Sequence, residues 1–160
     1  MRAKEYSVTQ VLIGTHRVGL VGLRGCLQMV GRSDLEDKDA IIGLMMEELS
    51  RSNFIPDTRA EEYRAAVWRE YLRSRGEDFS EFYSELPVVL RGGSDEERDR
   101  LDRMITSALA KHELRPAMTV VRAAEEDLEL VLEIDGEVVV RGLPTLDGLR
   151  KAVRHRLSDW

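Results

Sequence analysis

The chain has 160 residues, of which 42% are hydrophobic and 34% are charged, and its formal net charge is −6. This length and composition fit one ordinary domain or two small ones, and they exclude a disordered chain as well as a membrane protein. Basic and acidic residues are divided equally between the two halves and form no basic block, so general affinity for nucleic acid or anionic lipid is disfavoured.

The first residues and the cysteine count bear on the compartment. No apolar core of a secretory signal follows residues 1–5, and no run approaches the roughly 20 apolar residues of a membrane span. Cys26 is the only cysteine, which excludes an intramolecular disulfide and any site that needs two thiolates. We therefore expect a cytoplasmic protein with no disulfide and no membrane segment.

The N-terminal stretch predicts a β-hairpin. Two β-rich runs, 10–14 and 17–22, flank a short turn that contains Gly14. The residues that follow, 23–30, predict a short helix.

Two longer helices come next. The capping-box patterns at 33–36 and 58–61 predict their starts; the first helix ends near Asn53 and the second continues to about Arg75. The acidic segment 77–85 predicts a linker or a short docking helix. Together these elements define an N-terminal domain of hairpin plus helices over residues 1–80.

The pattern changes after Pro87, where a second domain is predicted over residues 86–160. A buried strand at 88–90 precedes a third capping box, 94–97, which opens the most regular amphipathic helix of the chain. Pro116 separates that helix from a strand predicted at 118–121.

The chain ends in a hairpin and a helix. Residues 130–134 and 137–140 flank Asp135-Gly136, a strong signal for a two-residue hairpin turn. Both alternating sets of side chains in this hairpin are apolar, so the sheet is expected to be covered on both faces. Apolar positions from Leu146 to Leu157 predict the last helix. The fold class is α+β, with the order β-α-β-β-β-α in the second domain.

The ending Val131-Leu132-Glu133-Ile134-Asp135-Gly136-Glu137-Val138-Val139-Val140, followed by the last helix, resembles the closing hairpin and helix of the thioredoxin-like superfamily. The stretch 13–23, with 53–56 and 62–66, is similar to a poorly characterised domain of anaerobe and archaeal proteins that in several cases precedes a thioredoxin-like domain. These resemblances imply a C-terminal thioredoxin-like α/β sandwich and a role in anaerobic redox or metal metabolism.

The sequence departs from that family where the family does its chemistry. Thiol exchange needs a CxxC at the start of the first helix, and by position that site is Ser94-Asp95-Glu96-Glu97. The family's proline before the third strand is missing from residues 128–130, and the link from Val121 to Leu128 is too short for the usual crossover helix. If the resemblance holds, the redox function has been lost.

Cys26 and the three histidines are the remaining candidates for chemistry. Cys26 is interpreted either as a reactive thiol near Arg24 or as a small buried apolar residue in register with its helix neighbours. His16, His112 and His155 are scattered without metal-ligand spacing, so no metal site, cofactor or catalytic residue is predicted.

Two surface features complete the list. Aromatic residues gather near the domain boundary and are interpreted either as packing between the domains or as an interface for a protein partner or a second copy; they are Trp68, Tyr71, Phe79, Phe82 and Tyr83. Arginines on the preceding helix form a basic side that either contacts nucleic acid or forms a solvated, salt-bridged surface; they are Arg64, Arg69, Arg73 and Arg75.

These observations favour a non-catalytic adaptor or accessory protein that acts through protein–protein contacts. The alternative is a transcriptional regulator that binds nucleic acid through its N-terminal half. A third possibility, an enzyme with a small ligand between the domains, has no residues to name.

Overall fold

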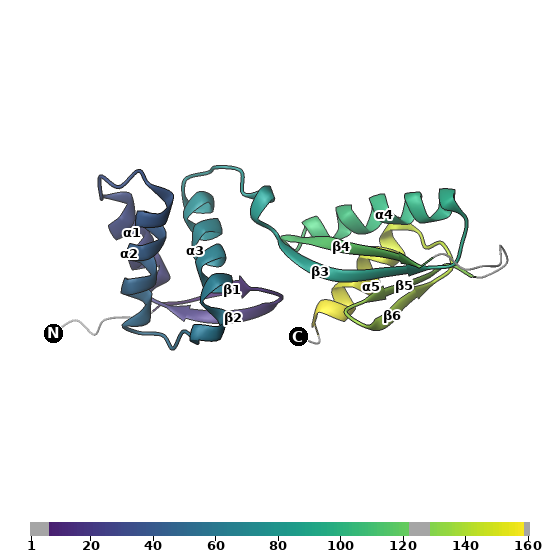
Figure 1. The fold of residues 1–160 in the computed structure, drawn as a ribbon, viewed down its shortest axis with the longest axis horizontal. Coiled ribbons are helices and arrows are strands. Elements are labelled where there is room, and N and C mark those ends of the chain that lie inside the picture. Colours follow the sequence, from purple (N-terminus) through teal and green to yellow (C-terminus); the bar gives the residue numbers. More distant parts are fainter. Residues whose placement is uncertain (1–6, 122–128, 159–160) are drawn as a thin grey trace. The chain divides into compact units, whose positions relative to one another are not determined.

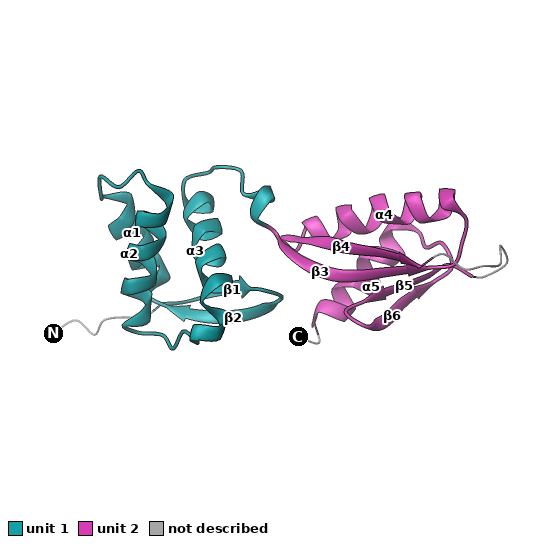
Figure 2. Cartoon of the chain, in the orientation of Figure 1, with its two compact units in different colours: residues 1–82 teal, residues 83–160 magenta. Residues whose placement is uncertain are grey.

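The computed structural model describes residues 7–121 and 129–158. The chain divides into two compact units, residues 1–82 and 83–160 (Figures 1 and 2). The first contains a hairpin and helices, and the second contains a mixed sheet with two helices, so the α+β prediction is confirmed.

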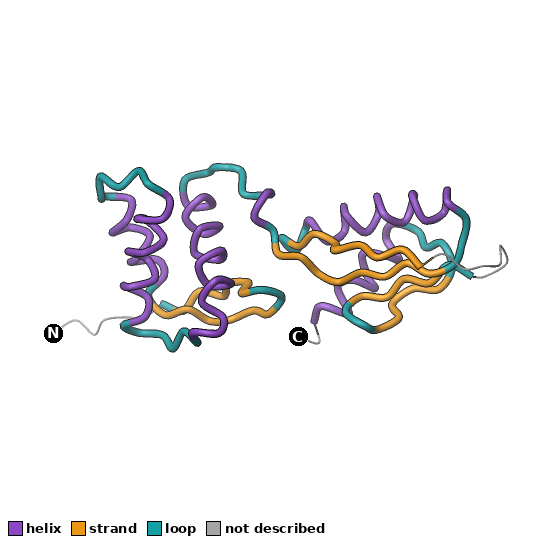
Figure 3. The backbone as a smooth tube through the Cα atoms, viewed as in Figure 1, coloured by secondary structure: helices purple, strands orange, loops and turns teal. Residues whose placement is uncertain are grey.

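Unit 1 begins with an antiparallel hairpin of β1 (Val8–Ile13) and β2 (His16–Val21), joined by a two-residue turn (Figure 3). Gly14 adopts a φ of 58° in that turn, which a side chain at this position would resist. The hairpin is followed by α1 (Leu23–Gly31), α2 (Lys38–Ser50), a 3₁₀ turn at Asp57–Arg59, α3 (Ala60–Ser74) and a second 3₁₀ turn at Ser80–Phe82.

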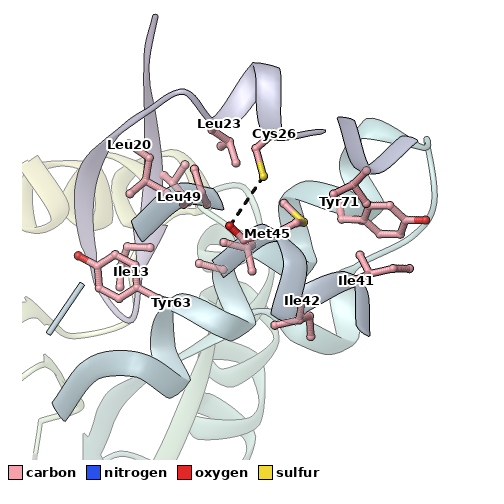
Figure 4. Packing of buried hydrophobic residues seen from close by; sticks show 14 of the residues in the cluster. Ile13, Leu20, Leu23, Cys26, Ile41, Ile42, Met45, Leu49, Tyr63 and Tyr71 are labelled. Carbon is pink, nitrogen blue, oxygen red and sulfur yellow. Dashed lines mark hydrogen bonds between the residues drawn. The ribbon is translucent and has the colours of Figure 1, made fainter. Parts of the chain in front are cut away.

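The core of unit 1 forms where α1, α2 and α3 meet one face of the hairpin (Figure 4). Apolar residues recur every three or four positions on each helix, and these are the residues that become buried. Each fully buried aliphatic side chain stabilises the fold by about 1.5–3 kcal/mol. The largest of them are Ile13, Leu20, Leu23, Ile41, Met45 and Leu49.

The predicted helices exist, but two of the predicted capping boxes are wrong. The hydroxyl of Ser33 donates to the carbonyl of Val30 at 2.6 Å and so completes the end of α1. Asp37 caps α2 instead, accepting from the backbone N–H of Ala40 at 2.9 Å. No side chain caps α3, because the 3₁₀ turn leads into it and the side chain of Arg59 bonds elsewhere.

Unit 2 has the order β3 (Ser84–Arg91), α4 (Asp95–Ala110), β4 (Leu114–Val121), β5 (Val131–Ile134), β6 (Glu137–Arg141), α5 (Leu146–Ser158). The strands form one sheet in the spatial order β4-β3-β5-β6. β3 is parallel to β4 and antiparallel to β5, and β5 and β6 form the hairpin predicted at Asp135-Gly136.

Two strands of unit 2 are longer than predicted. β3 begins before Pro87 rather than after it, and β4 includes Pro116 rather than starting beyond it. Pro116 is tolerated because β4 is an edge strand, where one side of the backbone needs no partner strand. The segment 122–128, for which the sequence predicts no crossover helix, lies outside the described residues.

Within the described residues the sheet of unit 2 is covered on one face, so the prediction of two covered faces is wrong. On β3, Leu86, Val88 and Leu90 are buried, whereas their neighbours Glu85 and Arg91 are exposed. The helix α4 packs on β4, and the helix α5 packs on β6. The two helices also contact each other, and together they complete the core on the buried face of the sheet. The hairpin residues that suggested a second buried face are partly exposed instead, with Val138 45% exposed.

None of the helices among the described residues combines the length and apolar character that crossing a bilayer would require.

Candidate functional site

Cys26 lies in the core of unit 1, on α1 (Figure 4). It is 2% exposed, and its thiol donates a long hydrogen bond to the carbonyl of Met45, with 3.8 Å between the sulfur and the oxygen. Burial, followed by the negative charge of Glu48, raises the pKa of the Cys26 thiol to about 11. A reactive cysteine needs to form a thiolate, and the raised pKa disfavours the thiolate of Cys26. Cys26 is surrounded by the core of unit 1, as a small apolar packing residue would be.

The start of α4, where the thioredoxin resemblance implies two thiols, is a complete capping box. The backbone N–H of Glu97 donates to the hydroxyl of Ser94 at 3.1 Å, and the Glu97 carboxylate accepts from the N–H of Ser94 at 3.0 Å. Arg98 donates to the carbonyls of Gly92 and Gly93 and pairs with Asp95. Capping and loop fixation thus account for the polar groups at this helix end.

The histidines do not converge. His16 is exposed at the turn of the first hairpin, His112 is half-buried after α4, and His155 is exposed near the end of α5. In residues 7–121 and 129–158 no three histidine, cysteine, aspartate or glutamate side chains are placed to share a metal ion.

Four of the five boundary aromatics belong to unit 1, and Tyr83 is the first residue of unit 2. The rings of Trp68 and Tyr71 stack, with centroids 5.2 Å apart and planes 22° apart. The ring of Phe82 meets Trp68 edge to face at 6.4 Å. Such pairs contribute about 0.5–1.5 kcal/mol beyond the area they bury. The cluster therefore holds the segment after α3 onto unit 1.

Cations lie over the rings of this cluster. The Lys38 ammonium is 5.3 Å from the centroid of Trp68 and 4.7 Å from that of Phe82. The guanidinium of Arg73 lies 4.6 Å from the Phe79 ring, and that of Arg75 lies 5.6 Å from the Tyr71 ring. The negative faces of these rings are thus partly occupied by the chain's own positive charges.

The interpretation of Arg69 as part of an exposed basic surface is wrong. Arg69 is 3% exposed and donates to the carbonyl of Leu12 on β1 at 2.6 Å and to that of Phe82 at 2.9 Å. It therefore ties the hairpin, α3 and the end of unit 1 together. The sequence could not separate it from the other arginines of α3, because its carbonyl partners are 57 and 13 residues away.

The other arginines of the helix are engaged with acidic residues. Arg64 lies 3.9 Å from Glu61 and 4.0 Å from Asp39, and Arg73 lies 3.4 Å from Glu70. Arg75 pairs with Glu77 at 3.1 Å, and the pKa of Arg75 is raised mainly by its hydrogen bond to that carboxylate. This side of α3 is a salt-bridged surface and presents no block of positive charge to phosphates.

A hollow of about 470 Å³ lies in unit 1 beside the aromatic cluster. The loop between α1 and α2 forms one wall and α3 forms the other. The lining side chains combine aromatic, aliphatic and acidic groups: Ser33, Asp34, Leu35, Glu36, Ile41, Trp68, Tyr71, Arg75 and Glu77. Neither Asp34 nor Glu36 forms an ion pair with the part of the chain that the structure describes.

Phe54 is the functional candidate that the sequence reasoning missed. Its side chain is 86% exposed, although the loop that carries it is firmly held. The side chain of Asn53 accepts from the N–H of Val21 at 2.8 Å and donates to the carbonyls of Val21 and Leu49 at 2.9 and 2.8 Å. On the other side, Ile55 packs against the core. The sequence marked this stretch as a helix end and as part of the resemblance to the anaerobe and archaeal domain, but it did not single out Phe54.

The uncovered face of the sheet in unit 2 is the other exposed apolar surface. Cross-strand ion pairs lie on it, Arg115 with Glu85 and Arg91 with Glu133, both at 3.0 Å. Between them lie half-buried Val89 and Val131, and Val138 is exposed. The face is amphipathic, with a valine centre and a charged margin.

Comparison of the chain with models of protein families, with curated proteins and with solved structures finds no match.

Proposed function

We propose that this chain is a non-catalytic adaptor or accessory protein that binds a protein partner. The observation that carries the proposal is Phe54, an aromatic ring presented to solvent on a rigid loop. Packing against the rest of the chain does not explain a ring that is 86% exposed. Because Asn53 and Ile55 fix the backbone on both sides, burying the ring in a partner would cost little conformational entropy.

The thioredoxin-like interpretation of unit 2 supports the same conclusion. Unit 2 has the chain order β-α-β-β-β-α, which is the order on which the sequence resemblance to that superfamily rests. A capping box stands where its thiols would be, and a protein of this kind without thiols acts through its surface. The sequence resemblance to anaerobe and archaeal proteins extends the proposal to a partner in anaerobic redox or metal metabolism.

The location we propose is the cytoplasm. Cys26 is unpaired and buried, which agrees with a reducing compartment. The partner is a second protein or a second copy of this chain.

Affinity purification tests the proposal. The full-length chain, tagged, is recovered from the cells that naturally produce it, and co-purifying proteins are quantified for the wild type and for Phe54→Asp. We expect one partner, or a second copy of the chain, to be lost from the variant by about tenfold or more, as for an aromatic hot spot worth about 2 kcal/mol.

The matched control is Leu143→Asp, which places the same charge at an exposed apolar residue of unit 2. It should retain the partner, and circular dichroism should show that both variants remain folded. Equal recovery of the partner by Phe54→Asp and the wild type would overturn the role of Phe54. Reduction of insulin disulfides by the purified protein, abolished by Cys26→Ser, would overturn the non-catalytic assignment.

A further inference from the structure

We infer that a second copy of this chain pairs with the outer edge of β4, in the antiparallel direction and across a twofold axis at Thr119. The inference goes beyond the proposed function, because it concerns a different surface, in unit 2, and assigns one occupant to it. Its basis is a difference between the two edge strands of the sheet, of which only one is protected against an added strand.

The edge formed by β6 is protected. The sheet has the order β4-β3-β5-β6, so within the described residues no strand lies on the outer side of β4 or of β6 (Figure 1). β6 has five residues, with exposed charged residues at both ends, Glu137 and Arg141, and its pairing with β5 contains a register shift. Short length, charge and bulges are the usual devices that prevent an edge strand from pairing with another chain.

The edge formed by β4 is protected only over its first half. β4 has eight residues, and its one charged residue, Arg115, and its proline, Pro116, lie near its start. The strand ends in three consecutive exposed residues, Thr119, Val120 and Val121, which are β-branched and uncharged. Residues of this kind favour strand pairing, and nothing on their side chains opposes a second strand.

The hydrogen bonds of β3 show which backbone groups face the neighbouring strands. The carbonyl of Pro87 accepts from the N–H of Asp135 at 2.9 Å, so the backbone groups of Pro87 lie on the side of β5. Backbone groups alternate in direction along a strand, and those of Val88 therefore point to β4.

The same geometry identifies the free groups of β4. In a parallel pair, a residue whose groups point to its neighbour bonds to the two residues that flank its register partner. The register partner of Val88 is Met118, so the N–H and C=O of Met118 point away from β3. By alternation the groups of Val120 point outward as well. Those of Pro116 do too, which agrees with the position of prolines on edge strands, where no N–H is needed.

A twofold axis at Thr119 satisfies these outward groups. It places Met118 of one copy opposite Val120 of the other, and each such pair exchanges two N–H···O bonds. The axis generates the pair twice, as in every isologous contact. A register with Met118 opposite itself would bring Pro116 opposite Val120, and that pair would lack one of its two bonds because proline has no N–H.

The side chains also fit a second copy. Met118 and Val120 are in register with Val88 and Leu90, which are 0% and 1% exposed, so they lie on the core side of the sheet. Val120 is nevertheless 46% exposed, because no further strand follows. The pairing sets apolar Met118 beside apolar Val120 on this face and Thr119 opposite itself on the other. No like charges meet across the axis, so the segment is complementary to its own reverse.

The first test is the oligomeric state of the full chain. Sedimentation velocity is measured at chain concentrations from about 1 μM to about 1 mM. We expect a dimer, with twice the 18.3 kDa mass of one chain, to form as the concentration rises. Val120→Lys should weaken dimerisation by about tenfold or more, because an edge charge opposes strand pairing. The matched control is Val138→Lys on β6, since Val138 is 45% exposed and Val120 is 46% exposed. The control should leave dimerisation unchanged, and circular dichroism should show that both variants are folded.

The second test is a disulfide across the axis. The Cα atoms of the two Thr119 residues would be about 4.5 Å apart, within the range of about 4.4–6.8 Å that a disulfide spans. Thr119→Cys should therefore form a covalent dimer in a glutathione buffer. Ala117→Cys, on the same face of β4, should not, because its two copies would be at least about 13 Å apart along the strands. The native Cys26 is buried, so the wild type is the blank.

Three results would overturn the inference. The first is a chain that stays monomeric over the whole concentration range, whether or not its β4 edge takes up a strand of another protein. The second is an equal effect of Val120→Lys and Val138→Lys on dimerisation. The third is equal crosslinking, or none, of Thr119→Cys and Ala117→Cys.

The two proposals fail in different ways. If Phe54→Asp dissolves the dimer and Val120→Lys does not, the second copy binds at Phe54, and the pairing of β4 is wrong while the adaptor proposal stands. If the dimer depends on Val120 and no partner depends on Phe54, the pairing of β4 stands and the adaptor function based on Phe54 is wrong.

Discussion

Arg69 provides the most informative test of how unit 1 is held together. Replacing it with alanine removes two charged hydrogen bonds, to the carbonyls of Leu12 and Phe82, and leaves both oxygens without that donor. A hydrogen bond from a charged group contributes about 1.5–3 kcal/mol, so the loss of two such bonds costs about 3 kcal/mol or more. We therefore expect Arg69→Ala to destabilise unit 1 by about 3 kcal/mol or more, which is a large part of the stability of a small domain.

Urea unfolding provides the measurement. In a Trp160→Phe background the fluorescence of Trp68 reports on unit 1, because Trp68 is then the only tryptophan. Arg69→Lys should lose less than Arg69→Ala, because an ammonium keeps the charge but has a compact head that does not span both carbonyls. Arg51→Ala is the control: Arg51 is an exposed residue of unit 1, and its surface ion pairs with Glu47 and Glu48 contribute at most about 1 kcal/mol. The reasoning is refuted if Arg69→Ala unfolds at the same urea concentration as Arg51→Ala.

Three further outcomes are expected. Asn53→Ala should lower the unfolding free energy by about 2–3 kcal/mol, because it leaves the N–H and C=O of Val21 unpaired; no shift of the urea midpoint would show that the loop is held by other contacts. Ser94→Ala should reduce the stability of unit 2 by about 1 kcal/mol, measured by thermal unfolding, whereas a substitution at exposed Thr106 should change little. The pKa of the Cys26 thiol is about 11 in the folded chain and about 9.0 in the unfolded chain. Between pH 9 and 11 the thiol therefore loses its proton in the unfolded state but keeps it in the folded state. Folding stability should then fall by about 1.4 kcal/mol per pH unit from pH 9 to 11 relative to Cys26→Ala, and parallel pH profiles would contradict this.

Local patterns predicted the elements whose causes are local. The capping box at Ser94 depends on a hydroxyl and a carboxylate three residues apart, and the turn at Asp135-Gly136 depends on two neighbouring residues. Both are present as predicted. The capping box expected at Ser33 is absent because the Ser33 hydroxyl donates instead to the carbonyl of Val30, at the end of α1. A pattern of four residues does not show which of two local partners is preferred.

The candidate site depended on long-range contacts and was predicted less well. Arg69 looked like its exposed neighbours because the sequence does not reveal which side of α3 meets the carbonyl of Leu12. The sequence placed Phe54 just beyond a helix end near Asn53, and only the fold shows that its side chain lies outside the core. The composition of the segment was enough to recognise the aromatic cluster. The boundary between the two units, which falls between Phe82 and Tyr83 and so divides the cluster, follows from the folding of each unit.

The first hairpin has a consequence for the way partners can bind. A two-stranded ribbon normally offers two rows of unpaired backbone groups to any extended peptide. Here arginine and asparagine side chains occupy part of each row, at Leu12 on one margin and at Val21 on the other. An incoming strand would have to break these bonds before it could align. Each margin of the ribbon therefore has fewer backbone groups left to pair with an added strand.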